Sequence, residues 1–128
     1  MIARLLLDTN VIIDHLRGQV DAMAFIRGLH APPLTSVVVV AELYAGVRDG
    51  TERTRLEEFL SGLEIVPRSR AAAIEGGLYR RAFAKNHNVG LDDALIAATA
   101  EIECATLVTL NRKHFPMLAD IVVPYTKP

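Results

Sequence analysis

Short runs of consecutive apolar residues alternate along this chain with longer segments whose apolar residues recur every three or four positions. Unbroken apolar runs are typical of strands buried on both faces, and the longer spacing is typical of helices. The runs predict five strands, at residues 3–7, at the start of 34–48, at 64–67, at 105–110 and at 121–125. The spacing predicts helices from Val11 onward and within 19–30, 36–48, 51–63, 69–88 and 91–104, with a short helical piece near 114–118.

The segment 34–48 carries two signals. Its four valines favour a strand and AELYAGVR favours a helix, so we expect a brief strand followed by a helix that Ser36 caps. Alternation of apolar strands with helices implies a parallel sheet covered by helices on both faces. We therefore predict an α/β fold with a Rossmann-like sheet of about five strands, as a single domain over residues 1–128.

The composition is that of a folded globular domain, with 51% hydrophobic and 23% charged residues and a net charge of −1. Because the net charge is so small, nucleic-acid binding would need a local basic patch or metal ions. The single Cys104 excludes an intrachain disulfide, and no apolar segment approaches the roughly 20 residues that a membrane span needs. We expect a cytoplasmic protein that does not contact the membrane.

Asp8 directly follows the first predicted strand, and Asn111 follows the fourth. In a parallel sheet, ligands bind beyond the carboxyl ends of the strands. Asp8 is also well placed to cap the helix that begins near Val11, and for Asp8 alone capping is the simpler explanation. Asp8 becomes a candidate site residue only if other acidic side chains lie close to it.

Glu42 and Asp93 are acidic residues on otherwise apolar faces of predicted helices. Residues three and four positions from Glu42 are small or apolar, and so are those that share a face with Asp93, out to Cys104. A buried charge without a partner is costly, so each carboxylate needs one. The simpler alternative for Glu42 is a place at the edge of its apolar stripe, paired with Arg48.

Asp92 and Asp93 are neighbours that a helix separates by about 100°. Asp92 shares its side with Thr99 and Glu103, a wetter edge, so the sequence predicts a capping role for Asp92 and an inward position for Asp93. Negative charge at a helix N-terminus is stabilised by about 0.3 to 1 kcal/mol, so capping stays an alternative for both residues.

Three inward carboxylates, Asp8, Glu42 and Asp93, cannot share one pocket while ionised unless a cation neutralises them or one takes up a proton. Oxygen ligands without a Cys or His cluster favour Mg²⁺ or Mn²⁺ over zinc. Such a site usually serves phosphate chemistry, in which the metal binds a phosphoryl oxygen and activates water. These three residues are therefore the candidate catalytic residues and metal ligands.

Four stretches of the sequence resemble the PIN-domain ribonucleases, and specifically the VapC-type toxins of bacterial toxin–antitoxin pairs. They are LLLDTNVII around Asp8, TSVVVVAELYAGV around Glu42, LDDALIAATA around Asp93 and TLVTLNRKHF around Asn111, and together they cover essentially the whole chain. The resemblance implies a Rossmann-like parallel sheet, an Mg²⁺-dependent endonuclease acting on RNA, and inhibition by a VapB-type antitoxin. It also implies a homodimer formed through helices such as 51–63 and 69–88.

Carried over residue by residue, the resemblance makes Asp8, Glu42 and Asp93 the acidic ligands of that family. It makes Thr9, Asn10 and Thr109 polar residues that support them. Many relatives have a further acidic residue after the fourth strand, where this chain has Asn111 and then His114. Asn111 can coordinate a metal through its carbonyl oxygen but brings no charge, which leaves a second metal open.

Arg112 and Lys113, beside the proposed site, are candidate contacts for RNA phosphates, with an ordinary solvated surface as the alternative for each.

Two other functions remain. A haloacid-dehalogenase-type phosphatase has a second aspartate two residues after its nucleophile, where this chain has Asn10. A PIN-fold module that binds RNA or protein without catalysis is disfavoured by the three retained acids, although the uncharged Asn111 leaves room for it.

Overall fold

The computed structural model describes residues 4–127, apart from the side chain of Asn86, so Ala3, the first residue of the strand predicted at 3–7, lies outside the described residues. Five strands form one parallel sheet in the order β3-β2-β1-β4-β5. The strands are β1 (Arg4–Leu7), β2 (Leu34–Ser36), β3 (Glu64–Val66), β4 (Ala105–Val108) and β5 (Ile121–Val122). The helices are α1 (Thr9–Leu16), α2 (Val20–Arg27), α3 (Val37–Gly46), α4 (Thr51–Ser61), α5 (Arg70–His87) and α6 (Leu91–Ile102), with one 3₁₀ turn, η1 (Arg112–His114).

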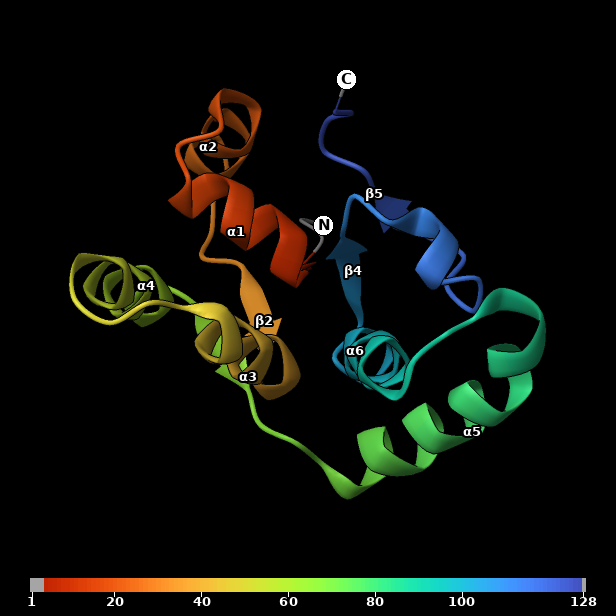
Figure 1. The fold of residues 1–128 in the computed structure, drawn as a ribbon. Helices are drawn as coiled ribbons and strands as arrows, with labels where there is room; N and C mark the ends of the chain where they lie inside the picture. Colours follow the sequence, from red (N-terminus) through yellow and green to blue (C-terminus); the bar gives the residue numbers. More distant parts are fainter. Residues whose placement is uncertain (1–3, 128) are drawn as a thin grey trace.

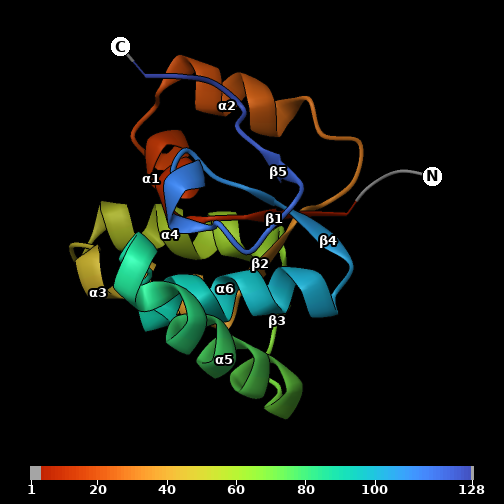
Figure 2. The ribbon, with the colours of Figure 1, turned by 90° about the vertical axis from the view of Figure 1, so that its right-hand side faces the viewer.

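Helices cover the sheet on both sides, as Figures 1 and 2 show. In Figure 2, α1 and α2 lie on one side of β1 and β4, and α5 and α6 lie on the other. The predicted α/β fold with a five-stranded parallel sheet is confirmed. None of the helices within residues 4–127 is long and apolar enough to cross a membrane.

The boundaries of several elements differ from the prediction by a few residues; β4 ends at Val108 rather than 110, and the short helical turn covers 112–114 rather than 114–118. The last strand ends at Val122 rather than 125, because Pro124 has no N–H for the ladder. Helix α6 ends at Ile102, and Cys104 has a φ of 53°, so its exposed side chain leaves the helix face that it was expected to share with Asp93. Helix α1 begins at Thr9, two residues earlier than predicted.

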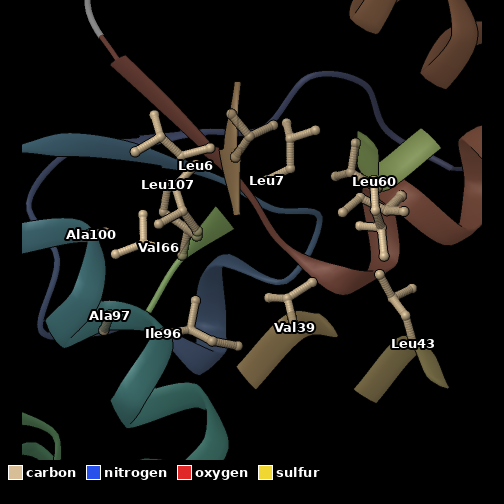
Figure 3. Close-up of a cluster of buried hydrophobic side chains, with 14 of the residues drawn as sticks. Leu6, Leu7, Val39, Leu43, Leu60, Val66, Ile96, Ala97, Ala100 and Leu107 are labelled. Carbon is tan, nitrogen blue, oxygen red and sulfur yellow. The ribbon is translucent and has the colours of Figure 1, made fainter. Parts of the chain in front are cut away.

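The core lies between the sheet and its helices (Figure 3). The inner strands contribute Leu6, Leu7 and Leu107, each at most 1% exposed, and the helices contribute Val39 and Ile96 at 0%. Burial of apolar surface at about 25 cal/mol per Å² makes this cluster the main source of stability. The central strands β1 and β4 are therefore fixed from both faces.

The far end of α1 is tied to the C-terminal segment. Asp14 is buried, and its carboxylate accepts hydrogen bonds of 2.9 Å from the Tyr125 hydroxyl and 2.8 Å from the Lys127 ammonium. A buried carboxylate is costly without such partners, so these two contacts secure the segment after β5 against α1.

Replacing Leu107 with alanine tests the role of the central strands. Leu107→Ala should lower the free energy of unfolding by about 2 to 5 kcal/mol, because it leaves a cavity at a fully buried position. The matched control is Leu91→Ala, since Leu91 is 53% exposed and its loss should cost far less. Urea denaturation of both variants measures the difference, and equal losses would contradict this description of the core.

Candidate active site

Asp8 lies where β1 ends and α1 begins, and it is only 6% exposed. Its Oδ1 accepts a 2.8 Å hydrogen bond from the Thr9 backbone N–H, so Asp8 is the N-cap of α1. Its Oδ2 accepts a 2.7 Å bond from the Thr109 hydroxyl. Thr109 directly follows β4, which pairs with β1 so that Leu7 lies opposite Val108. Parallel pairing of the two strands therefore brings Asp8 and Thr109 to the same edge of the sheet.

Glu42 reaches this edge from α3, which begins directly after β2. The Ser36 hydroxyl accepts a 3.2 Å capping bond and starts α3 there, as the sequence predicts. The Thr9 hydroxyl donates a 2.6 Å hydrogen bond to Glu42 Oε1. Arg48, the alternative partner for Glu42, instead pairs with Glu52 at 3.1 Å. Glu42 is thus connected to Asp8 through the single residue Thr9.

Asp93 enters the site from the first turn of α6. Its side chain is 20% exposed, and its Oδ2 lies 3.4 Å from Nδ1 of His114 in η1. The charges of Asp8 and Asp92 both act on this carboxylate. Asp8, Glu42 and Asp93 therefore act on one another from the end of β1, from α3 and from α6, which are far apart in the sequence.

The structure corrects the capping role predicted for Asp92. The N-cap of α6 is Gly90, and no side chain makes a capping bond there. Asp92 is exposed, as its wetter edge suggests, but it lies close enough to Glu42 to raise the pKa of that carboxyl. A Cβ at position 90 would lie 2.7 Å from Asp92 Oδ1, so the glycine leaves room for this carboxylate.

The Thr109 hydroxyl is the centre of a small polar network. Besides donating to Asp8, it accepts bonds from the Asn10 side-chain amide at 3.3 Å and from the Asn111 backbone N–H at 3.1 Å. Asn10 Oδ1 in turn accepts a 3.3 Å bond from the Leu110 N–H. The residues expected to support Asp8 thus connect α1 to the loop after β4.

The remaining candidates lie at the rim. Asn111 precedes η1, its side chain is exposed, and it makes no capping bond. Arg112 and Lys113 are exposed in η1, and Arg112 donates a 3.4 Å bond to the Ile121 carbonyl. The sequence predicts that Asn111 lies at the edge of the sheet but does not show which side chain of residues 111–114 faces the site. Among the described residues of that stretch, His114 is the one that lies close to a site carboxylate, that of Asp93.

The electrostatics of the site oppose ionisation of its acids. Burial raises the pKa of Asp8 against the opposing effect of its bonds from Thr109 and Thr9. Burial, with added repulsion from Asp92 and Asp8, raises the pKa of Glu42 to about 7. Burial and the charge of Asp92 raise the pKa of Asp93 to about 6, although His114 opposes this shift. The site therefore holds more negative charge than its surroundings neutralise.

These residues fit a hard divalent cation. The donors are carboxylate oxygens, and a cation would relieve the repulsion that raises their pKa values. In the part of the chain that the structure describes, no three His, Cys, Asp or Glu side chains are already placed as the ligands of one ion. The bond from the Thr9 hydroxyl occupies Oε1 of Glu42 and leaves Oε2 without a side-chain donor among the described residues. Both oxygens of Asp8 already accept one bond each, Oδ1 from the Thr9 N–H and Oδ2 from the Thr109 hydroxyl, so a cation would use their remaining lone pairs.

Comparison with known proteins decides the family. The PIN domain family matches residues 5–120. Ribonuclease VapC10 from Mycobacterium tuberculosis is 37% identical over 127 residues, which cover 97% of this chain and 95% of that protein. The chain belongs to the PIN-domain family, among the VapC ribonucleases. Ribonuclease VapC19 from the same species is 38% identical over 125 residues, which cover 94% of this chain and 98% of that protein.

Solved structures agree with this placement in the VapC family. A toxin-antitoxin complex from Klebsiella pneumoniae contains a chain with a TM-score of 0.84 and 27% identity, covering 96% of this chain and 99% of that one. A chain of VapBC2 from Rickettsia felis, bound to a DNA fragment from its promoter, gives a TM-score of 0.75 and 28% identity and covers 92% of this chain and 95% of its own length. The PIN architecture therefore extends over nearly the whole chain.

The raised pKa values predict how the metal-free protein responds to pH. Glu42 has a folded pKa of about 7 against 4.5 for the free side chain, so between these values the folded state retains a proton that the unfolded state has released. Its contribution to stability is complete below pH 4.5 and is lost as the pH rises toward 7. Melting temperatures in EDTA should therefore fall over this range, and Glu42→Gln should flatten the decline.

Added Mg²⁺ supplies the control for this experiment. A cation held by the carboxylates stabilises the folded state by mass action, so Mg²⁺ should raise the melting temperature most where the acids are ionised, near and above pH 7. The interpretation fails if Glu42→Gln and the unmodified protein show the same pH dependence in EDTA.

Proposed function

We propose that this VapC-family ribonuclease is the toxin of a toxin–antitoxin pair and hydrolyses RNA phosphodiester bonds with a water that a bound Mg²⁺ or Mn²⁺ activates. One observation carries the proposal: Asp8, Glu42 and Asp93, from three separate elements, meet at the carboxyl edge of the sheet with pKa values raised mainly by burial. The named relatives are ribonucleases, and the structural neighbours include toxin-antitoxin complexes. We further propose that residues 1–128 act as one PIN domain in the cytoplasm.

Asp8, Glu42 and Asp93 would hold the metal, with Asn111 as a neutral further ligand at the rim. When bound, a divalent ion supplies charge neutralisation for the phosphate and lowers the pKa of a water. The chain's own hydroxyls have a separate task. Thr109 orients the Asp8 carboxylate and Thr9 orients that of Glu42, so both acids are positioned before substrate arrives.

Both alternative functions lose support. A phosphatase of the haloacid-dehalogenase type needs a proton donor two residues after Asp8, but Asn10 is an amide that bonds to Thr109 and the Leu110 backbone. In a PIN module without catalysis, a cluster of wholly or partly buried acids would cost free energy of folding without serving a reaction. Here Asp8 and Glu42 also keep their hydroxyl partners, which favours a working site.

The proposed partners are a VapB-type antitoxin and a second copy of the chain. The antitoxin follows from the neighbours, which include VapBC2 from Rickettsia felis. A homodimer is supported by apolar side chains on the outer face of α5, where Ile74 is 56% and Leu78 is 44% exposed.

Neighbouring aspartates on α6 should respond differently to the loss of charge. Asp93→Asn should reduce cleavage at least about 100-fold, because it removes the negative charge of a proposed ligand that is only 20% exposed. Asp92→Asn, its matched control, should keep most of the activity at neutral pH and shift the acidic limb of the pH–rate profile to lower pH, because Asp92 raises the pKa of Glu42.

Initial rates on one single-stranded RNA, at several Mg²⁺ concentrations and with EDTA, measure both variants alongside thermal melting. Cleavage that survives full chelation would contradict metal dependence. A dead but folded Asp92→Asn enzyme would move the ligand assignment from Asp93 to its neighbour.

Toxicity in cells tests the biological part of the proposal. Expression without the antitoxin should arrest bacterial growth, and Glu42→Gln should relieve the arrest, because the amide keeps the shape of the side chain but removes its charge. Immunoblotting shows that the variant is present at the same level. A stably expressed Glu42→Gln protein that is still fully toxic would remove Glu42 from the site.

A further inference from the structure

A groove of about 810 Å³ opens beside Glu42, between α1, α3 and α4. Its floor is apolar and includes Leu16 from α1 and Leu43 from α3. Arginines stand around it, with Arg17 at the end of α1 and Arg55 on α4. The groove therefore places arginines close to Glu42, one of the three acids of the candidate site.

The arginines of the rim differ in their neighbours. Arg48 is held by Glu52 at 3.1 Å, which neutralises both side chains. Among the described residues, Arg17 and Arg55 make no salt bridge, and both are exposed. The groove that Glu42 lines thus has two arginines outside any salt bridge, and of these Arg17 also acts by its charge on Glu52, which lines the groove too.

A shallower hollow continues from the groove and shares Leu16 and Arg55 with it. Here the rings of His15 and Phe59 lie 4.7 Å apart, and Glu58 adds one negative charge. Nδ1 of His15 is buried and has no hydrogen-bond partner in the part of the chain that the structure describes. The surface beyond Arg55 therefore offers the edges of two aromatic rings, while the unpaired Nδ1 of His15 lies beneath it.

We propose that the RNA strand leaves the active site along this groove, with Arg17 and Arg55 binding its phosphates and the apolar floor receiving its sugars and bases. The inference rests on the proposed ribonuclease function and adds substrate-binding residues to it. Positive grooves with apolar or aromatic floors are the usual way in which proteins hold single-stranded nucleic acid.

Charge favours RNA over a protein as the occupant. The acidic cluster repels a polyanion, and the net charge of −1 provides no general attraction, so local cations are needed to bring phosphates to Glu42. Arg17 and Arg55 supply such cations in the groove that Glu42 lines. Arg112 and Lys113 lie in η1 and do not line this groove. A partner helix would use the apolar floor and would not require two arginines that make no salt bridge.

The double variant Arg17→Ala/Arg55→Ala tests the groove. For a single-stranded RNA of about 12 nucleotides, KM should rise roughly tenfold while kcat changes less than about twofold, because the arginines bind substrate away from the reacting bond. Each lost phosphate contact should reduce the slope of log affinity against log salt by about 0.7, so the double variant should lose about 1.4. A dinucleotide too short to enter the groove should show no change in KM.

Arg53→Ala is the matched control, since Arg53 lies on the same helix, pairs with Asp49 and Glu57, and does not line the groove. If the double variant does not fold, Arg55→Ala alone should raise KM severalfold, with a smaller salt effect. An unchanged KM for the longer RNA in a folded variant overturns the inference, as does a loss of antitoxin affinity without any loss of RNA affinity. If the unmodified protein with Mg²⁺ cleaves no RNA, the proposed function itself fails, which is a different result.

Discussion

Repulsion between carboxylates that the fold brings together is the constraint on which the site depends. Asp8 is nearly buried, and Glu42 and Asp93 are partly buried, so all three acids resist ionisation. The chain compensates only in part. Hydroxyls from Thr9 and Thr109 donate to two of the carboxylates, and hydroxyl donors lower a pKa without adding positive charge. The three carboxylates thus repel one another, and a bound divalent cation can offset this repulsion.

The register of the two central strands fixes this arrangement. Because Leu7 lies opposite Val108, the residues that follow them, Asp8 and Thr109, come out side by side. Asn10 then closes the contact by bonding both to Thr109 and to the next backbone N–H. A slip of one residue between β1 and β4 would change which residues pack on each buried face of the sheet and would separate Asp8 from Thr109, so the packing that stabilises the sheet also positions the candidate site.

The sequence predicts the fold well because its signals are local. Apolar runs, the capping hydroxyl of Ser36 and the acids on apolar helix faces each belong to one element. It predicts less well what depends on how elements meet. Helical phase shows that Asp92 faces a wetter edge than Asp93, but not that α3 brings Glu42 against that edge. Likewise, nothing near His114 in the sequence indicates that η1 lies over Asp93, and the groove beside Glu42 exists only once α1, α3 and α4 are packed.

The bonds from Tyr125 and Lys127 to Asp14 have a practical consequence for handling the protein. Asp8 caps the first end of α1 and Asp14 lies near its last turn, so this one helix connects the segment after β5 to the edge of the sheet that holds the candidate site. A purification tag fused to the carboxyl-terminal end would lie next to this contact and would disturb the ion pair between the half-exposed Lys127 and the buried Asp14. A tag placed ahead of β1 avoids this tether, which makes the amino-terminal end the better choice for recombinant work.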